Sequence, residues 1–252
     1  MDSYDSIDKI VRPGERLDDL QRNGYVLIQD PSLFCFGMDA VLLADFARAG
    51  KKDHVLDMCT GNGVIPVLMA ARGKGGVFTG IELQEKSAEL AERNSRINRL
   101  EERFSVIQGD ICNADEILKS SKRPAVDVIT CNPPYMAAGD GLINPEDEKA
   151  LARHEITCKF RDVSFQASKV LKDGGHIYLV HRPRRLAELT VELKKNSLEP
   201  KRMRFVHSFA GKEAVMVLID AVKGGGVQMI VEPPLVIYRE DGEYTREVKE
   251  MY

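Results

Sequence analysis

Residues 54–71 of the chain read HVLDMCTGNGVIPVLMAA. The first part is an apolar run of strand length, and the last part has the length and composition of a buried helix. Between them, Gly61 and Gly63 permit a tight turn in which the backbone approaches a ligand closely. The segment therefore predicts a strand, a glycine turn and a helix, a unit that is typical of α/β folds.

The same alternation of strand and helix continues after this unit. Alternation of this kind gives right-handed crossovers and a mostly parallel sheet with helices on both faces. Two later runs, residues 201–208 and 214–221, have no long helical pattern between them and predict an antiparallel pair at the sheet edge. The other expected strands are residues 25–29, 54–59, 77–83, 104–108, 126–131 and 176–181, and the expected helices are residues 36–48, 64–71, 85–98, 115–119, 160–171 and 184–195.

The chain has 252 residues, which suits one sizeable α/β domain. Within it we expect a cap segment over residues 1–50, a core over 51–223 and a tail over 224–252. Residues 1–24 are charged and are expected to be irregular or weakly helical. The polar stretch 137–148 is expected to be a mobile loop, because it cannot bury much apolar surface.

Composition excludes several classes of protein. The formal net charge is −3, so a contact with nucleic acid has to use a local basic patch. The five cysteines include no CxxC pair, which argues against a disulfide framework or a zinc site and indicates reduced thiols in a cytoplasmic protein. No metal is expected. The first ten residues are acidic and polar, unlike a signal peptide, and no apolar run approaches membrane-spanning length.

Acidic residues follow three successive predicted strands. Asp57 lies before the glycine turn, Glu82 ends the second strand and Asp110 follows the third. At the carboxyl edge of a parallel sheet, these carboxylates are placed to accept from a ligand ammonium, a ribose diol and an adenine amine, respectively. Each also has a structural alternative, which is ordering of the turn for Asp57, a solvated acid for Glu82 and a helix N-cap for Asp110. A dinucleotide is disfavoured because Pro66 replaces the third glycine of GxGxxG, and the GK[ST] of a P-loop is missing.

The fourth predicted strand ends in Asn132-Pro133-Pro134-Tyr135. Two prolines stop the strand and fix the backbone, so the Asn132 side chain and the Pro133 carbonyl can be held as two rigid acceptors. Two acceptors suit a planar NH2 group, because they bind both of its hydrogens and aim its lone pair at a methyl donor. Tyr135 suits stacking on a flat base. The alternative is a strand-ending turn with a buried tyrosine.

With these motifs in this order, the chain resembles the class I, Rossmann-like methyltransferases, whose sheet has seven strands. Asn-Pro-Pro-Tyr resembles the signature of their adenine-N6 and glutamine-N5 branches. Within them, the chain is similar to the bacterial tRNA(Val) adenine-N6 methyltransferases, which modify the adenine 3′ of the anticodon. The closer resemblance rests on residues 15–20, 36–43, 57–63, 152–155 and 180–186.

The resemblance implies S-adenosylmethionine as cofactor, with the segment from Phe36 to Asp39 near its methionine end. Many members have threonine at the position of Met38. The residues expected to bind the cofactor are Phe36, Gly37, Asp39, Asp57, Cys59, Gly61, Gly63, Glu82, Leu83, Asp110, Ile111 and Asn132, and those expected to be catalytic are Asn132, Pro133, Pro134 and Tyr135.

Basic residues are concentrated between positions 181 and 204, where they outnumber acids by five. Such a run suits an RNA phosphate backbone, and a solvated helix face is the alternative. The residues expected to contact RNA are Arg153, His154, Arg182, Arg184 and Arg185. The expected function is therefore methylation of adenine N6 in RNA, with tRNA as partner. Ribosomal RNA, a protein glutamine amide and a non-catalytic RNA-binding module with a residual pocket are the alternatives.

Overall fold

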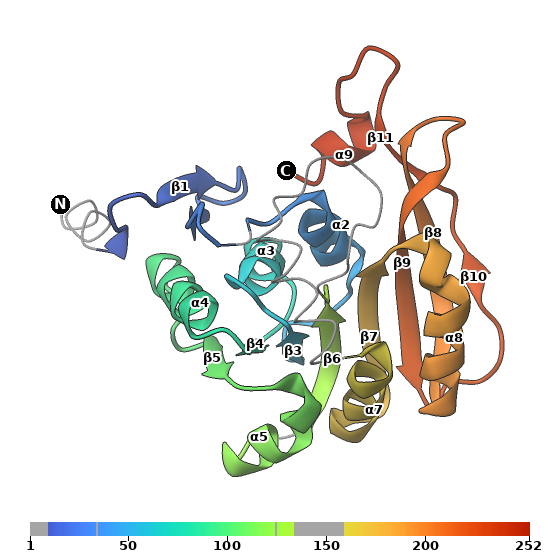
Figure 1. Ribbon diagram of the computed structural model, residues 1–252, viewed down its shortest axis with the longest axis horizontal. Helices are drawn as coiled ribbons and strands as arrows, with labels where there is room; N and C mark the ends of the chain where they lie inside the picture. The colour runs from blue at the N-terminus through green and yellow to red at the C-terminus, as the bar shows by residue number, and fades with distance from the viewer. Residues whose placement is uncertain (1–9, 34, 124, 134–158) are drawn as a thin grey trace.

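The computed structural model describes residues 10–33, 35–123, 125–133 and 159–252 of the chain. A central sheet runs through it, with helices on both faces (Figure 1). The strands of this sheet are β3 (His54–Met58), β4 (Val77–Glu82), β5 (Phe104–Gln108), β6 (Val126–Cys131), β7 (Leu171–His181), β8 (Leu198–Phe209), β9 (Ala214–Lys223), β10 (Ile230–Val231) and β11 (Leu235–Tyr238).

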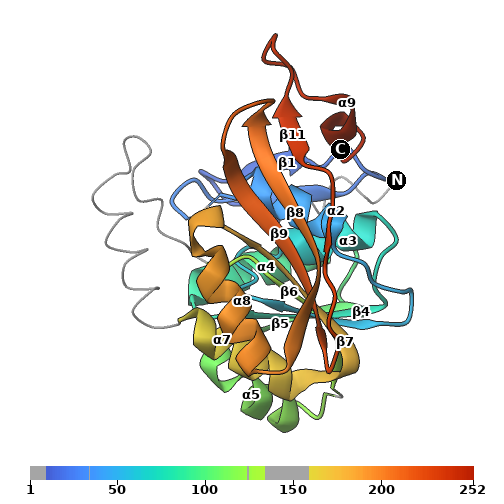
Figure 2. The same cartoon turned by 90° about the vertical axis from the view of Figure 1, so that its right-hand side faces the viewer.

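The order along the sheet is β10-β8-β9-β7-β6-β3-β4-β5, with β11 also paired to β8. Strands β5, β4, β3, β6 and β7 pair in parallel. Strand β9 is antiparallel to both β7 and β8, so the predicted antiparallel pair is confirmed. It lies one strand inside the edge, because β10 and β11 pair in parallel with β8 beyond it (Figure 2). The α/β, Rossmann-like fold class is confirmed. The expected number of seven strands is wrong, because β10 and β11 of the tail pair with β8 and give a nine-stranded sheet among the described residues.

Helices cover both faces of the sheet. Successive side chains of a strand point alternately to one helical layer and to the other. The helices are α2 (Met38–Phe46), α3 (Val64–Ala71), α4 (Glu85–Ile97), α5 (Ala114–Ser120), α7 (Phe160–Val170), α8 (Leu186–Lys195) and α9 (Arg246–Lys249), with short 3-10 helices η1 (Ile111–Asn113) and η2 (Pro183–Arg185). Val55 of β3 belongs to the core with α2 and α3, whereas its neighbour Leu56 belongs to the core with α5, α7 and α8. Side chains that alternate between two buried faces explain the continuous apolar runs in the sequence.

The N-terminal segment is more ordered than the sequence indicates. Strands β1 (Arg16–Asp19) and β2 (Val26–Gln29) form an antiparallel pair, so the expectation of irregular or weakly helical structure over residues 1–24 is wrong for residues 16–19. Most of β1 is exposed, and pairing with β2 supplies the order that its charged sequence does not reveal. The tail beyond residue 223 likewise contains β10, β11 and α9. Leu235 and Val248 of this tail are buried in the same core as α2 and α3.

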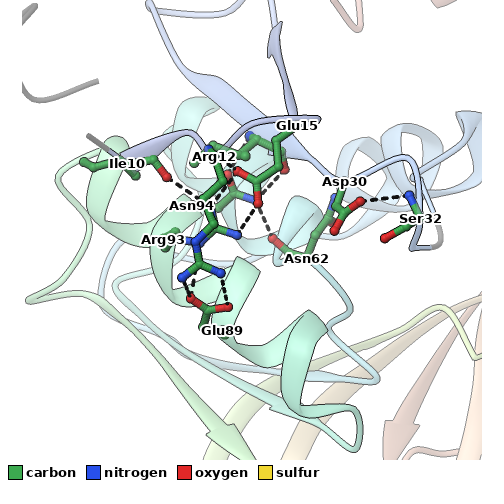
Figure 3. Close-up of polar contacts among 10 residues, drawn as sticks. Ile10, Arg12, Glu15, Asp30, Ser32, Asn62, Glu89, Arg93 and Asn94 are labelled. Carbon is green, nitrogen blue, oxygen red and sulfur yellow. Dashed lines mark hydrogen bonds and ion pairs between the residues drawn. The ribbon is translucent and has the colours of Figure 1, made fainter. Parts of the chain in front are cut away.

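A buried ion pair attaches the N-terminal segment to α4, as Figure 3 shows. The guanidinium of Arg93 donates to both carboxylate oxygens of Glu15, at 2.7 and 2.5 Å. It also donates to the Ile10 carbonyl at 3.0 Å. On the same helix Asn94 exchanges two hydrogen bonds with the backbone of Ile28 in β2. The segment before the glycine turn is therefore fixed to the first half of the sheet.

Within the described ranges, no helix has the length and apolar character needed to cross a membrane. The same residues contain no cluster of histidine, cysteine and acidic side chains arranged to hold a metal ion.

Candidate active site

The candidate site lies at the carboxyl ends of β3, β4, β5 and β6, where the predicted motifs meet. The backbone N–H of Gly61 donates to Oε2 of Glu82 at 2.9 Å, and the N–H of Gln84 donates to Oε1, also at 2.9 Å. The Glu82 side chain is 7% exposed. Each carboxylate oxygen keeps a second lone pair beyond the one used by the backbone. Glu82 therefore holds the turn and retains acceptor capacity for a hydroxyl pair.

The glycines of the turn serve two different purposes. Gly61 has φ +56°, and an added Cβ would meet nothing within 4 Å, which leaves open space above this backbone. Gly63 has φ +80° and lies against the core, where an added Cβ would stand 2.9 Å from the Phe104 ring. Cys59 also has a positive φ of 60°, which is uncommon for a residue with a side chain. The turn is therefore strained on its sheet side and open on its outer side.

Asp57 lies beneath this turn and is fully buried. Its two carboxylate oxygens accept from the hydroxyls of Thr60 and Thr130, each at 2.6 Å. Burial raises the pKa of Asp57 to about 7, against the opposing effect of these two hydrogen bonds. In this structure Asp57 orders the turn and connects it to β6. Gly80 of β4 permits the arrangement, because a Cβ there would be 2.7 Å from Thr60.

Asp110 and its neighbours follow the carboxyl end of β5. Asp110 is the N-cap of η1, and its Oδ1 accepts from the Cys112 N–H at 2.8 Å. Ile111 is buried, whereas Leu83, next to Glu82, is 41% exposed. The arrangement matches the capping alternative for Asp110, whose cap uses one of its two carboxylate oxygens.

Asn132 follows the carboxyl end of β6 and lies against the first turn of α2. The Nδ2 of Asn132 donates to Oδ2 of Asp39 at 3.0 Å, across 93 positions of the chain. Oδ1 of Asn132 is buried and has no hydrogen-bond partner among the described residues. Pro133 follows and is half-buried. The other two motif residues, Pro134 and Tyr135, lie outside the described residues.

The segment leading to α2 contains the remaining predicted cofactor residues. Gly37 is the N-cap of α2, and Phe36 donates its N–H to the Oε1 of Gln29 at 3.2 Å. The sulfur of Met38 accepts from the hydroxyl of Tyr252 at 3.8 Å. The end of the tail thus contacts the beginning of α2 beside Asp39.

Two cysteines lie at neighbouring strand ends, Cys59 directly after β3 and Cys131 as the last residue of β6. The Cys131 thiol beside Cys59, together with burial, raises the pKa of Cys59 well above its usual range. A protonated thiol is a poor nucleophile, so Cys59 contributes shape rather than reactivity.

The predicted RNA contacts divide between described and undescribed residues. Arg153 and His154 lie outside the described residues. Arg182 and Arg184 follow the carboxyl end of β7, where Arg184 is exposed and Arg182 donates to the Val215 carbonyl at 3.2 Å. Arg185 forms an ion pair with Glu188 at 2.6 Å. His181, just before them, is buried, and burial lowers its pKa to about 4.

Two other arginines of the basic run, Arg202 and Arg204, form ion pairs within the fold. Arg202 is nearly buried between Asp220 and Glu232, with its guanidinium 3.7 Å from the centre of the Phe46 ring. Arg204 forms an ion pair with Glu247. These acids lie outside the basic run, so they reduce the local charge excess of the sequence in space. The arginines at the end of β7 stay a predicted RNA contact.

Three supporting residues were missed from the sequence. Asn94 is fully buried, and its Nδ2 donates to the Asn62 carbonyl in the glycine turn at 2.9 Å. Thr60 and Thr130 hold Asp57. The available signals are an asparagine in a helix interior and threonines in or beside apolar strands, because a buried amide or hydroxyl is costly without a hydrogen-bond partner.

Comparison with known proteins agrees with this geometry. A family model described as "Methyltransferase domain" matches residues 49–229. The tRNA1(Val) (adenine(37)-N6)-methyltransferase of Shewanella sp. (strain MR-4) is 30% identical over 84% of this chain and 88% of its own length. The protein of the same name from Porphyromonas gingivalis (strain ATCC 33277) is 30% identical over 73% of this chain and 72% of its own.

Solved structures share the fold. The crystal structure of a predicted O-methyltransferase from Agrobacterium tumefaciens superposes with a TM-score of 0.67, covering 85% of this chain and 95% of that one at 23% identity. At this identity the likeness shows the fold alone. The family model and the curated relatives show the family: the chain belongs to the methyltransferase domain family and, within it, to the tRNA1(Val) (adenine(37)-N6)-methyltransferases.

Proposed function

We propose that this chain methylates the N6 amino group of an adenine in tRNA, using S-adenosylmethionine, and that its target is adenine 37 of tRNA1(Val). The relatives it matches are named for this reaction and this nucleotide. The observation that carries the proposal is the Asn132 amide, whose nitrogen is bound to Asp39 while its oxygen is buried without a partner among the described residues. The NH2 group of a target adenine would supply the hydrogen-bond donor that this oxygen lacks.

The residues of the strand ends fit the cofactor. When bound, S-adenosylmethionine supplies a methyl group on a positively charged sulfur, which leaves as a neutral thioether as the N–C bond forms, and the amine then releases one proton. Glu82 would hold the ribose hydroxyls through the lone pairs that its backbone contacts leave unused. The open outer side of Gly61 gives room for a ligand against the backbone. Phe36 and Gly37, next to Asp39 in the chain, would lie toward the amino-acid end.

The chain's own part in the reaction is to orient the amine. An exocyclic amine is a weak nucleophile, since its lone pair is delocalised into the ring. Oδ1 of Asn132 and the carbonyl of Pro133 would each accept one of its hydrogens, which favours a tetrahedral nitrogen with a localised lone pair. Preorganised acceptors of this kind also stabilise the positive charge that develops on the nitrogen. Tyr135 would stack on the base.

An adenine in a folded tRNA has to be splayed out of its stack to reach these acceptors. Arg182 and Arg184, at the end of β7, would hold phosphates beside it, with Arg153 and His154 of the segment that follows Asn132. Phosphate contacts make binding fall with salt. We therefore expect Arg184→Ala to weaken tRNA binding and to reduce its salt dependence. The proposed reaction would take place in the cytoplasm.

The direct test uses radiolabelled S-adenosylmethionine, the purified protein and a tRNA1(Val) transcript. Digestion and nucleoside chromatography should yield N6-methyladenosine, and a transcript with guanine at position 37 should take up no label. Total RNA from cells lacking the protein tests other targets. Label in ribosomal RNA or in a protein glutamine, with none in tRNA, would overturn the proposal.

A further inference from the structure

The contact between Asn132 and Asp39 fixes which end of the amide faces the site. The two ends of an amide have nearly the same shape, so the hydrogen-bond network decides its orientation. An ionised carboxylate accepts and cannot donate. With Oδ2 of Asp39 at 3.0 Å, the Asn132 nitrogen must face helix α2, and the oxygen must face the opposite way.

Asp39 is itself held in place. Its Oδ1 accepts from the backbone N–H of Ala40 at 2.9 Å. An added Cβ on Gly37 would be 3.0 Å from the same oxygen, so the glycine leaves room for this side-chain position. Asp39 stands in the first turn of α2, where the helix dipole favours a negative charge. The carboxylate is therefore held in a fixed orientation.

This arrangement has an energetic cost at the side-chain oxygen of Asn132. It is buried and has no hydrogen-bond partner among the described residues. A buried acceptor without a partner costs about 1–3 kcal/mol of stability, and such groups in native proteins call for an explanation. An amide free to turn would place its NH2 toward the target amine and repel it. Asp39 prevents that turn.

We propose that Asp39 is a positioning residue for methyl transfer, which acts through Asn132 by presenting the amide oxygen to the target amine. A hydrogen bond from an amide to a carboxylate also polarises the amide and makes its oxygen a stronger acceptor. The negative charge of Asp39 lies behind that oxygen and favours the positive nitrogen of the transition state. This inference rests on the proposed function and assigns Asp39 a task other than contact with the cofactor.

The first variant is Asp39→Asn, which keeps the shape and removes the charge. One amide oxygen cannot accept from both Ala40 and Asn132, so the amide of Asn132 is no longer fixed. We expect the single-turnover rate of methyl transfer to fall about 10- to 100-fold, since a small misplacement of a reacting group costs this much. Cofactor affinity by calorimetry and the melting temperature should remain at wild-type values.

The decisive variant exchanges the two side chains. Asn132→Asp alone sets two carboxylates within hydrogen-bonding distance and should be slow, because like charges repel. Combined with Asp39→Asn, the new asparagine donates to the new aspartate, whose other oxygen again faces the target. The double variant should be faster than either single variant. A residue with a merely structural role would not produce this recovery.

Asp45→Asn is the matched control. Asp45 lies on the same helix, its side chain is 40% exposed, and it pairs with Arg72 at 3.9 Å. Its substitution should leave the transfer rate at the wild-type value.

The outcomes separate the two proposals. Wild-type protein that methylates no RNA refutes the proposed function. Wild-type activity together with a normal rate in Asp39→Asn refutes the positioning role alone. A loss of cofactor affinity in Asp39→Asn with an unchanged rate at saturation would make Asp39 a cofactor ligand instead. An exchanged double variant no faster than the faster single variant also overturns the proposal.

Discussion

The backbone N–H of Gly61 donates to a carboxylate oxygen of Glu82 at 2.9 Å, so the acid that ends β4 holds the turn that follows β3. The second oxygen of Glu82 accepts from Gln84, at the start of α4. One side chain thus connects two strand ends and a helix. Its remaining lone pairs face outward from a rigid position, which reduces the entropy lost on binding a ligand.

Substitution of Glu82 tests this double role. We expect Glu82→Ala to weaken cofactor binding about 10- to 100-fold, because hydrogen bonds to a charged group are each worth about 1.5–3 kcal/mol. Isothermal titration calorimetry measures the affinity. Glu85→Ala is the control, since Glu85 is exposed and lies three positions further on. Equal affinity in wild type and Glu82→Ala would exclude the ribose role.

Asn132→Ala removes one of the two proposed acceptors without altering the glycine turn. We expect methyl transfer to fall by about 10²- to 10³-fold, comparable to the loss of one preorganised group that stabilises transition-state charge. Cofactor binding should survive, because Glu82 and the turn are untouched. Single-turnover rates with labelled cofactor provide the measurement. A wild-type rate in this variant would remove Asn132 from the mechanism.

Asp57 predicts a pH dependence of stability. Burial raises its pKa to about 7, whereas an aspartate in the unfolded chain titrates near 3.9. The folded protein binds the extra proton between these values. The stability from Asp57 is therefore fully present below about pH 4 and is lost as the pH rises through about 7, at roughly 1.4 kcal/mol per pH unit.

The matched measurement compares wild type with Asp57→Asn by urea denaturation between about pH 5 and pH 8. Asparagine can still bond with Thr60 and Thr130 but does not titrate. The free energy of unfolding of wild type should decline relative to the variant as the pH rises. A constant difference across this range would contradict a raised pKa.

The Glu15–Arg93 pair predicts an effect on the free energy of unfolding. Its side chains are 6% and 10% exposed, and the hydrogen bond from Arg93 lowers the pKa of Glu15. Glu15→Gln leaves a nearly buried guanidinium short of a partner, so we expect a loss of roughly 1–3 kcal/mol in the free energy of unfolding. Arg12→Ala breaks an exposed pair with Glu89 and should cost no more than about 1 kcal/mol. Equal losses in the two variants would contradict this ranking.

The elements around the motifs follow from local pattern. The helix over Val64–Ala71 and the strands over Phe104–Gln108 and Val126–Cys131 have the bounds expected from the sequence. Their signals are long apolar runs that end at glycine, proline or an acid. Strand β1 gave no such signal, because its order comes from pairing with β2 rather than from burial.

Parts of the candidate site follow from local pattern in the same way. A parallel sheet necessarily brings its carboxyl ends to one edge, so the order of the motifs along the chain was enough to predict that Asp57, Glu82, Asp110 and Asn132 gather there. The charge excess of the basic run near position 200 is larger in the sequence than in the folded protein. Its compensating acids, Glu232 and Glu247, are distant in sequence and near only in the fold.

The sequence by itself determined the α/β class, the strand ends that form the site and the chemistry of the proline-braced amide, because these depend on local periodicity and residue type. Only the tertiary structure decided three contacts. Asp39 accepts a hydrogen bond from Asn132, Asp57 accepts from the Thr130 hydroxyl, and Asn94 donates to the glycine turn. Each of these is a hydrogen bond between segments far apart in the chain, and its geometry exists only once the helices have packed on the sheet.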